Sequence, residues 1–165
     1  MPETQEIVIN TGPIIALVAA LGDLEILKIY RRVYVPLERE ACGEITTGES
    51  SRFAAREFEA AHWLEKWKQP LSLSAMLTNS LDVGEASVIQ LALNERIRTV
   101  CIDESAGRRM GRLNGLLVTG SVGILLRVKR EVHSFSMREA LQRMKSRGIW
   151  LSQSVEDFAL REAGE

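Results

Sequence analysis

Short apolar runs alternate with helical segments along most of this chain, and this alternation constrains its fold more than any other feature. Residues 7–9, 33–35, 99–102 and 116–118 have the length and composition of buried strands. Short buried strands that alternate with helices are typical of a parallel sheet with helices on both faces. We therefore expect an α/β fold in which one central parallel sheet is flanked by helices.

The helical segments follow from proline positions, apolar periodicity and turn signals. Helices are expected to begin at Pro13 and Pro36 and to cover residues 53–68, 82–96, 105–113, 122–130, 137–147 and the segment from 152 onward. Residues 70–80 are expected to be irregular. Because 165 residues is the size of one ordinary domain, we expect a single domain over residues 1–165, with residues 137–165 as a C-terminal helical extension.

The charged residues are unevenly distributed, although the net charge is only −1. Residues 96–147 hold twelve Lys or Arg side chains against four Asp or Glu side chains, and the rest of the chain is acidic. A basic part beside an acidic part suits a protein that holds a cation next to a polyanion. Exposed helices that simply carry arginine would give the same distribution, so both interpretations stay open.

The two cysteines and the apolar segments indicate the compartment. Cys42 and Cys101 lie in apolar surroundings without C-x-x-C spacing, which favours buried thiols in a reducing compartment over a disulfide or a zinc site. No segment has the pattern of a signal peptide or the length of a membrane span. We expect a cytoplasmic protein without a membrane partner.

Three polar positions stand at expected strand ends or helix starts, where function gathers in parallel sheets. Asn10 follows the first strand, and Asp103 ends the apolar run 100–102. Glu85 stands in a first helical turn, three residues after Asp82. Each position also has a structural interpretation: Asn10 and Asp103 could cap helices, and Asp82 with Glu85 has the form of a capping box.

Two further acids lie on the helix expected from Pro36. Glu40 and Glu44 are four residues apart, so they share one face of that helix. Glu44 borders its apolar side, although most glutamates on such helices are solvated. Singly, neither residue indicates a function.

The ordered combination of these residues resembles the PIN-domain nucleases, a family that gathers three or four acids around Mg²⁺ or Mn²⁺ to cut RNA. The pattern is strand-Asn-Thr, then Pro-x₇-Glu-Ile-x-x-Gly, then Asp-x-Gly-Glu at a helix start, and then Asp103 at a strand end. The resemblance spans nearly the whole chain and is closest to a prokaryotic, VapC-like branch of small PIN proteins that often has Asn at the first acidic position. The stretches that carry it are residues 7–13, 81–89, 101–109, 118–123, 126–130 and 148–152.

The resemblance implies which residues hold the metal ion. The family's four acids fall on Asn10, Glu44, Glu85 and Asp103, with Glu40 as the alternative second acid because the segment before Glu44 holds a small insertion. Glu85 and Asp103 would be the principal ligands of Mg²⁺ or Mn²⁺. Asn in place of Asp removes one formal charge, which should weaken metal binding and reduce or abolish cleavage.

Basic and aromatic residues supply the candidates for nucleic-acid binding. Arg108, Arg109 and Arg112 follow Asp103 and could grip phosphates, or they could form a solvated helix face. Ser121 resembles a phosphate-holding helix start, for which plain capping is the alternative. The tryptophans at positions 63, 67 and 150 are expected in the core or at an interface rather than as platforms for stacked bases.

The function implied by the resemblance is that of a divalent-metal-dependent endoribonuclease. Its setting would be a toxin–antitoxin pair, with RNA, a small antitoxin protein and a second copy of the chain as partners. The rival interpretation is a catalytically degenerate PIN domain that binds RNA or a protein, which Asn10 favours. A doubly wound nucleotide-binding domain is less favoured, because neither G-x-G-x-x-G nor a P-loop is present.

Overall fold

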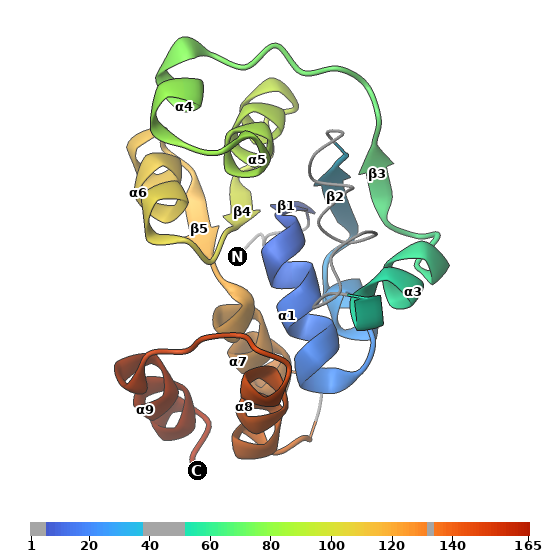
Figure 1. Cartoon of the computed structure of the whole chain (residues 1–165), viewed down its shortest axis with the longest axis vertical. Helices are drawn as coiled ribbons and strands as arrows, with labels where there is room; N and C mark the ends of the chain where they lie inside the picture. The colour runs from blue at the N-terminus through green and yellow to red at the C-terminus, as the bar shows by residue number, and fades with distance from the viewer. Residues whose placement is uncertain (1–5, 38–51, 132–133) are drawn as a thin grey trace.

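The computed structural model describes residues 6–37, 52–131 and 134–165, and its central sheet lies between layers of helices (Figure 1). The strands of the described ranges are β1 (Glu6–Ile9), β2 (Arg32–Pro36), β3 (Glu65–Trp67), β4 (Thr99–Cys101) and β5 (Leu117–Thr119). All neighbours pair in parallel, in the order β3-β2-β1-β4-β5. The expected sandwich with a central parallel sheet and helices on both faces is confirmed.

Most of the expected helices are present at the expected places. The helices are α1 (Thr11–Leu21), the 3₁₀ helix η1 (Glu25–Ile29), α3 (Arg52–Ala60), α4 (Ala75–Ser80), α5 (Val83–Asn94), α6 (Ser105–Leu113), α7 (Ser121–Glu131), α8 (Met137–Ser146) and α9 (Gln153–Glu162). The break between α8 and α9 falls at Gly148, whose φ of +85° lies in the left-handed region that glycine adopts readily. None of the described helices is long and apolar enough to cross a membrane.

Side chains of the strands alternate between two cores, one on each face of the sheet. Ile7 and Ile9 of β1 pack in the core shared with α1, α7 and α8. Val8, between them, packs with Val100 and Ile102 in the core shared with α4 and α5. This alternation explains why runs of three or four apolar residues suffice for each central strand, since both faces of the sheet are covered.

The order of the strands places a topological switch point between β1 and β4. The chain builds the sheet outward from β1 through β2 to β3, and then returns to the other side of β1 for β4 and β5. The two carboxyl ends are tied together, because the amide of Asn10 donates to the carbonyl of Cys101 at 3.0 Å. Crevices at such switch points are where open parallel sheets bind their ligands.

The prediction of one long helix over residues 53–68 is wrong. Helix α3 ends at Ala60, and β3 follows and pairs with β2. Trp63 and Trp67 are four residues apart, which is also the spacing of a helical face. Pairing with β2 overrides that pattern: the amide of Leu37 donates to the carbonyl of Trp67 at 2.8 Å, and the Trp67 ring packs 6.4 Å from that of Tyr34.

Two other expectations need correction. Pro36 is the last residue of β2 instead of the first residue of a helix. Residues 70–80 are only partly irregular, because Ser74 caps the short helix α4 by accepting a hydrogen bond from the amide of Leu77. The expected helix with Glu40, Glu44 and Cys42 lies outside the described residues.

The burial of Cys101 and of the three tryptophans can be compared with the expectations from the sequence. Cys101 is fully buried, as expected, and burial raises the pKa of its thiol well above the ordinary value. Trp63 and Trp67 are partly buried against the two cores, also as expected. Trp150 is 83% exposed, so it does not lie in the core, and its place at an interface stays a prediction.

Helices α8 and α9 complete the first core and lie at one end of the molecule (Figure 1). Helix α8 packs against α1, and α9 packs against α8 and α7. Met137, Leu141 and Met144 of α8 and Ala159 of α9 are buried in that core. The two helices thus share their apolar side chains with the elements that carry the sheet.

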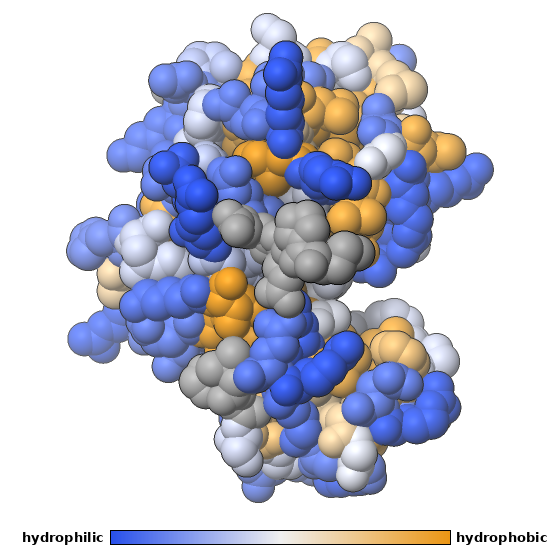
Figure 2. Space-filling model, turned by 180° about the vertical axis from the view of Figure 1, so that it is seen from behind, coloured by the Kyte–Doolittle hydropathy of each residue, from blue (hydrophilic) through white to orange (hydrophobic). Residues whose placement is uncertain are grey.

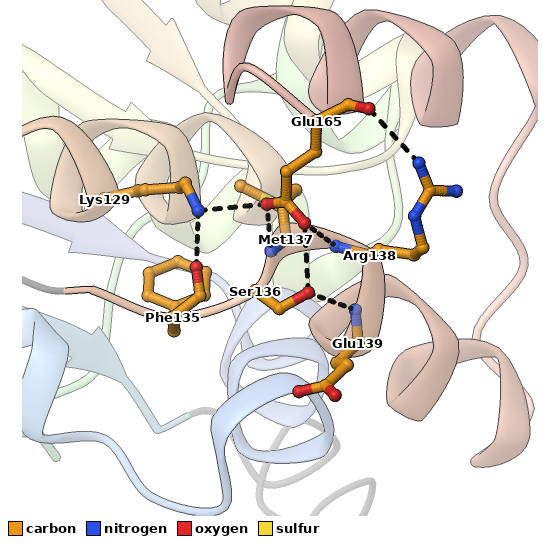
Figure 3. Close-up of polar contacts among 7 residues, drawn as sticks. All are labelled: Lys129, Phe135, Ser136, Met137, Arg138, Glu139 and Glu165. Atoms are coloured by element: carbon orange, nitrogen blue, oxygen red, sulfur yellow. Dashed lines mark hydrogen bonds and ion pairs between the residues drawn. The ribbon is translucent and has the colours of Figure 1, made fainter.

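Glu165 fastens the segment after α9 to the start of α8 (Figure 3). Its carboxylate forms an ion pair with Lys129 at 3.0 Å and accepts hydrogen bonds from the Met137 amide at 2.6 Å and the Ser136 hydroxyl at 3.0 Å. The Lys129 contact and the main-chain donors of Met137 and Arg138 lower the pKa of Glu165 to about 2. A side chain distant in sequence therefore helps to cap α8.

Candidate active site at the β1–β4 switch point

Asn10 and the start of α5 meet at the carboxyl end of β1. Asn10 caps α1, since its side-chain oxygen accepts a hydrogen bond from the amide of Thr11 at 3.0 Å. A Cβ atom on Gly84 would lie 3.3 Å from that same oxygen. The capping interpretation of Asn10 is therefore confirmed, and the cap also stands beside the turn of α5 that carries Glu85.

Glu85 is a buried carboxylate in the first turn of α5, with only 4% of the residue exposed. Asp82 caps the helix by accepting from the amide of Glu85 at 2.8 Å, so the forward half of the capping box is present. The backbone amide of Asp82 donates in return to the Glu85 carboxylate, but within the described ranges no positively charged side chain forms an ion pair with it. Burial first, and then the charges of Asp82 and Glu104, raise the pKa of Glu85 to about 7.

Helix α6 approaches Glu85 through a glycine face. A Cβ atom on Gly107 would stand 2.7 Å from a methyl group of Ile102 and 3.1 Å from the carboxyl carbon of Glu85. One turn later, a Cβ atom on Gly111 would stand 2.8 Å from a methyl group of Val118. Only residues without a side chain allow α6 to lie this close to the sheet and to the carboxylate.

Asp103 lies just beyond β4 and is anchored to the start of α7. Its carboxylate accepts a hydrogen bond from the amide of Ser121 at 2.7 Å. It does not cap α6, whose N-cap residue is Glu104. Asp103 is open to solvent, but surrounding protein atoms raise the pKa of its carboxylate, while the hydrogen bonds from Ser121 and the charge of Arg108 oppose that rise.

The predicted nucleic-acid-binding residues divide into two groups. The Arg108 guanidinium lies beside Asp103 and donates to the carbonyl of Ile102 at 3.0 Å. Arg109 and Arg112 are exposed on α6 and form no ion pair with any residue in the described part of the chain. Ser121 is buried, and its amide is already bound to Asp103, so this helix start holds a protein carboxylate in the place of a phosphate.

A cavity of about 780 Å³ opens beside Asp103. Asp103, Glu104 and Arg108 line it on the sheet side, and Trp150 and Phe158 line it on the side of α9. Seen from behind, the molecule is hollowed between the part that carries α6 and the part formed by α8 and α9 (Figure 2). Sequence analysis missed Glu104 as a site residue, although it directly follows Asp103. It also missed the aromatic wall, because nothing in the sequence connects residues so far apart.

The structure thus brings Asn10, Glu85 and Asp103 to one edge of the sheet. In residues 6–37, 52–131 and 134–165, no three His, Cys, Asp or Glu side chains form a ready-made metal site. The fourth predicted position, Glu44 or its alternative Glu40, lies outside these ranges. Two carboxylates and an amide oxygen nevertheless fit a hard cation such as Mg²⁺ or Mn²⁺, and a buried carboxylate without a positively charged partner is stabilised by a cation.

The chain was compared with protein families, curated proteins and solved structures. No curated protein and no solved structure significantly matches the chain. A family model does match: that of DUF3368, described as a PIN domain, covers residues 6–165. The match includes every element of the described sheet and both C-terminal helices.

Proposed function

The chain belongs to the PIN-domain family, whose members are generally nucleases that typically use divalent metal ions, and on this premise we propose that it is a metal-dependent endoribonuclease. Glu85 and Asp103 would be its principal metal ligands. Glu44 would complete the set, with Glu40 as the alternative, and Asn10 would orient a ligand or a bound water.

The observation that carries this proposal is the buried carboxylate of Glu85, which has no positively charged partner among the described residues. A structural glutamate in a protein interior is normally paired or hydrogen-bonded, since an isolated buried charge is strongly unfavourable. Here the described residues supply one backbone hydrogen bond, from Asp82, and no positive charge, and burial keeps the pKa of Glu85 raised. A divalent cation bound between this carboxylate and that of Asp103 would supply the missing partner.

Other residues would position the two carboxylates and contact the phosphate of the substrate. Ser121 holds the carboxylate of Asp103 at a fixed place through its amide, and α6 closes over Glu85 through Gly107. Arg108 places a positive charge beside Asp103, where a phosphate of the substrate would otherwise meet only acids. A bound Mg²⁺ or Mn²⁺ would activate water and stabilise the charge that develops on the phosphate.

The test is cleavage of a labelled single-stranded RNA by the purified protein with Mg²⁺ or Mn²⁺ and with EDTA. We expect metal-dependent cleavage that Glu85→Gln and Asp103→Asn each abolish while circular dichroism stays native. Glu95→Gln is the matched control, because Glu95 is exposed at the opposite end of the same helix. Cleavage that survives both site substitutions would reject the proposed site.

The rival function, a degenerate PIN domain that binds without cutting, is favoured by the amide at Asn10. Calorimetric titration of Mn²⁺ into wild type and Asn10→Asp separates the two. Binding by wild type supports the nuclease. Binding that appears only in Asn10→Asp supports the degenerate domain, because the added carboxylate would then restore a missing ligand charge.

The biological setting rests on the resemblance to VapC-like toxins alone. We propose a small antitoxin protein and a second copy of the chain as partners. Co-purification with the product of a short neighbouring reading frame would test the antitoxin. Light scattering of the purified protein, with a mass of one copy or of two, would test the homodimer.

A further inference from the structure

The cavity beside Asp103 has two walls of different chemistry. One wall carries the charged side chains of Asp103, Glu104 and Arg108 beside apolar residues of α1, β5 and α7. The opposite wall is formed by the connection between α8 and α9 and by α9 itself, and its side chains include Trp150, Val155 and Phe158. A ligand that fills this cavity must therefore present an anionic or metal-bound group on one side and an apolar group on the other.

The apolar wall is unusually exposed for side chains of its size. Trp150 is 83% exposed and Phe158 is 46% exposed, yet both line the cavity. Flat aromatic rings that are open to water beside a polar site are well suited to stack with another flat ring. Arg161 lies over the Phe158 ring at 5.9 Å, so positive charge is also present on this wall.

The charges around the cavity favour a nucleic-acid strand over an apolar protein surface as its ligand. An apolar face of a protein partner or of a second copy would bury Asp103 and Glu104 without compensation, which is unfavourable. A nucleic-acid strand carries phosphates for Arg108 and for the proposed metal ion, and it carries bases for the aromatic wall. Arg109 and Arg112 are exposed on the same helix as Arg108, so α6 carries further positive charge.

We propose that Trp150, supported by Phe158, holds a nucleobase of the substrate adjacent to the phosphate at Asp103. This inference rests on the proposed nuclease function and adds to it a side chain that would bind a base of an unpaired strand. A base in a duplex is stacked on its neighbours and paired with its partner, so its face is not accessible to Trp150. Trp150 is therefore a binding residue that favours single-stranded over double-stranded RNA.

The test measures binding separately from cleavage. Fluorescence anisotropy in EDTA gives the Kd of a labelled ten-nucleotide single-stranded RNA and of the matching blunt duplex. We expect Trp150→Ala to weaken single-strand binding about tenfold, which corresponds to about 1.4 kcal/mol at 25 °C. Trp150→Phe should keep most of the affinity, and the duplex should bind more weakly and with no dependence on Trp150.

Intrinsic fluorescence supplies a second readout, because a base stacked on an indole quenches its emission. Titration with the same RNA should quench wild type, and Trp150→Phe should lose that quenching although Trp63 and Trp67 remain. Trp63→Phe is the matched control, since Trp63 packs partly buried against the first core. It should leave both the affinity and the quenching unchanged.

Three outcomes would overturn the proposal: an unchanged Kd in Trp150→Ala, equal loss of duplex binding, or a change of oligomeric mass in Trp150→Ala that marks the aromatic wall as a protein interface. These outcomes leave the nuclease proposal intact if Glu85→Gln still abolishes cleavage. Conversely, base binding that depends on Trp150 in a protein without metal-dependent cleavage would reject the nuclease and retain the base site.

Discussion

Two glutamates at helix starts show opposite uses of the same side chain. Glu85 stands in the first turn of α5, where Asp82 already caps the helix, and burial raises its pKa to about 7. Glu165 reaches the start of α8 from the far end of the described chain and finds Lys129 and main-chain donors, which lower its pKa to about 2. One carboxylate is neutralised by a lysine and several amides, whereas the other has no positively charged partner among the described residues.

The difference identifies which carboxylate is structural and which is available for a ligand. A carboxylate that is ion-paired and hydrogen-bonded stabilises the native state, and its charge is already neutralised without a bound cation. An unsatisfied buried carboxylate weakens the metal-free native state and gains a partner when a cation binds. Substitutions of Glu85 and Glu165 should therefore differ in their effects on catalysis, metal affinity and stability.

The largest difference should be in catalysis. We expect Glu85→Gln to lower the rate of metal-dependent RNA cleavage more than about 100-fold, since even residues that only support metal ligands contribute about 10–100-fold. Glu165→Gln should keep the wild-type rate within about threefold at 25 °C, because it removes no proposed metal ligand. Single-turnover cleavage of labelled RNA measures both rates. Similar losses of cleavage rate in the two variants would contradict a metal-binding role for Glu85 and a purely structural role for Glu165.

The next effect is a pH dependence of metal affinity. Because the carboxylate of Glu85 must be ionised to bind a cation and its pKa is about 7, Mn²⁺ affinity should rise about tenfold from pH 6 to pH 8. Isothermal titration at several pH values measures it. Glu165→Gln should show the same rise, whereas in Glu85→Gln the rise should be absent. A flat profile in wild type would show that Glu85 does not bind the ion.

Stability should respond to Glu165 in the opposite sense. Glu165→Gln removes the charge that Lys129 and the α8 amides stabilise, so we expect a loss of about 1 kcal/mol and a Tm lower by about 2–4 °C at pH 7. The native pKa of Glu165 lies below its unfolded value, so this contribution is present above about pH 4.5 and is lost as the pH falls toward 2. Glu162→Gln, an exposed change on α9, is the control for thermal unfolding.

The smallest effect is expected for the stability of Glu85 in EDTA. Its native pKa lies above its unfolded value, so its stabilising contribution is complete below about pH 4.5 and is lost as the pH rises through 7. Glu85→Gln should therefore unfold at a Tm equal to or up to about 2 °C above wild type at pH 8, and show no gain at pH 5. A lower Tm at pH 8 would mean that the ionised carboxylate has a stabilising partner.

The sequence alone predicts this fold well where each segment carries its own signal. Strands such as Val33–Val35 and the helix start at Asp82 follow from local chemistry, and the structure confirms both. It fails where distant pairing decides the outcome, as at β3, whose three residues become a strand only by lying beside β2. The site shows the same limit. Asn10, Glu85 and Asp103 could be predicted from strand ends, but the exposed Trp150 that faces Asp103 across the cavity could not.

The glycine face of α6 has a consequence for how related sequences can change. Gly107 lies so close to Ile102 and Glu85 that a methyl group there would displace one or the other. Among relatives, position 107 should therefore vary only together with a smaller residue at position 102, even though it binds nothing itself. Covariation of positions 102 and 107 in an alignment would indicate relatives in which α6 still covers the carboxylate of Glu85. A bulky residue at position 107 together with an unchanged Ile102 would indicate relatives in which α6 no longer covers that carboxylate.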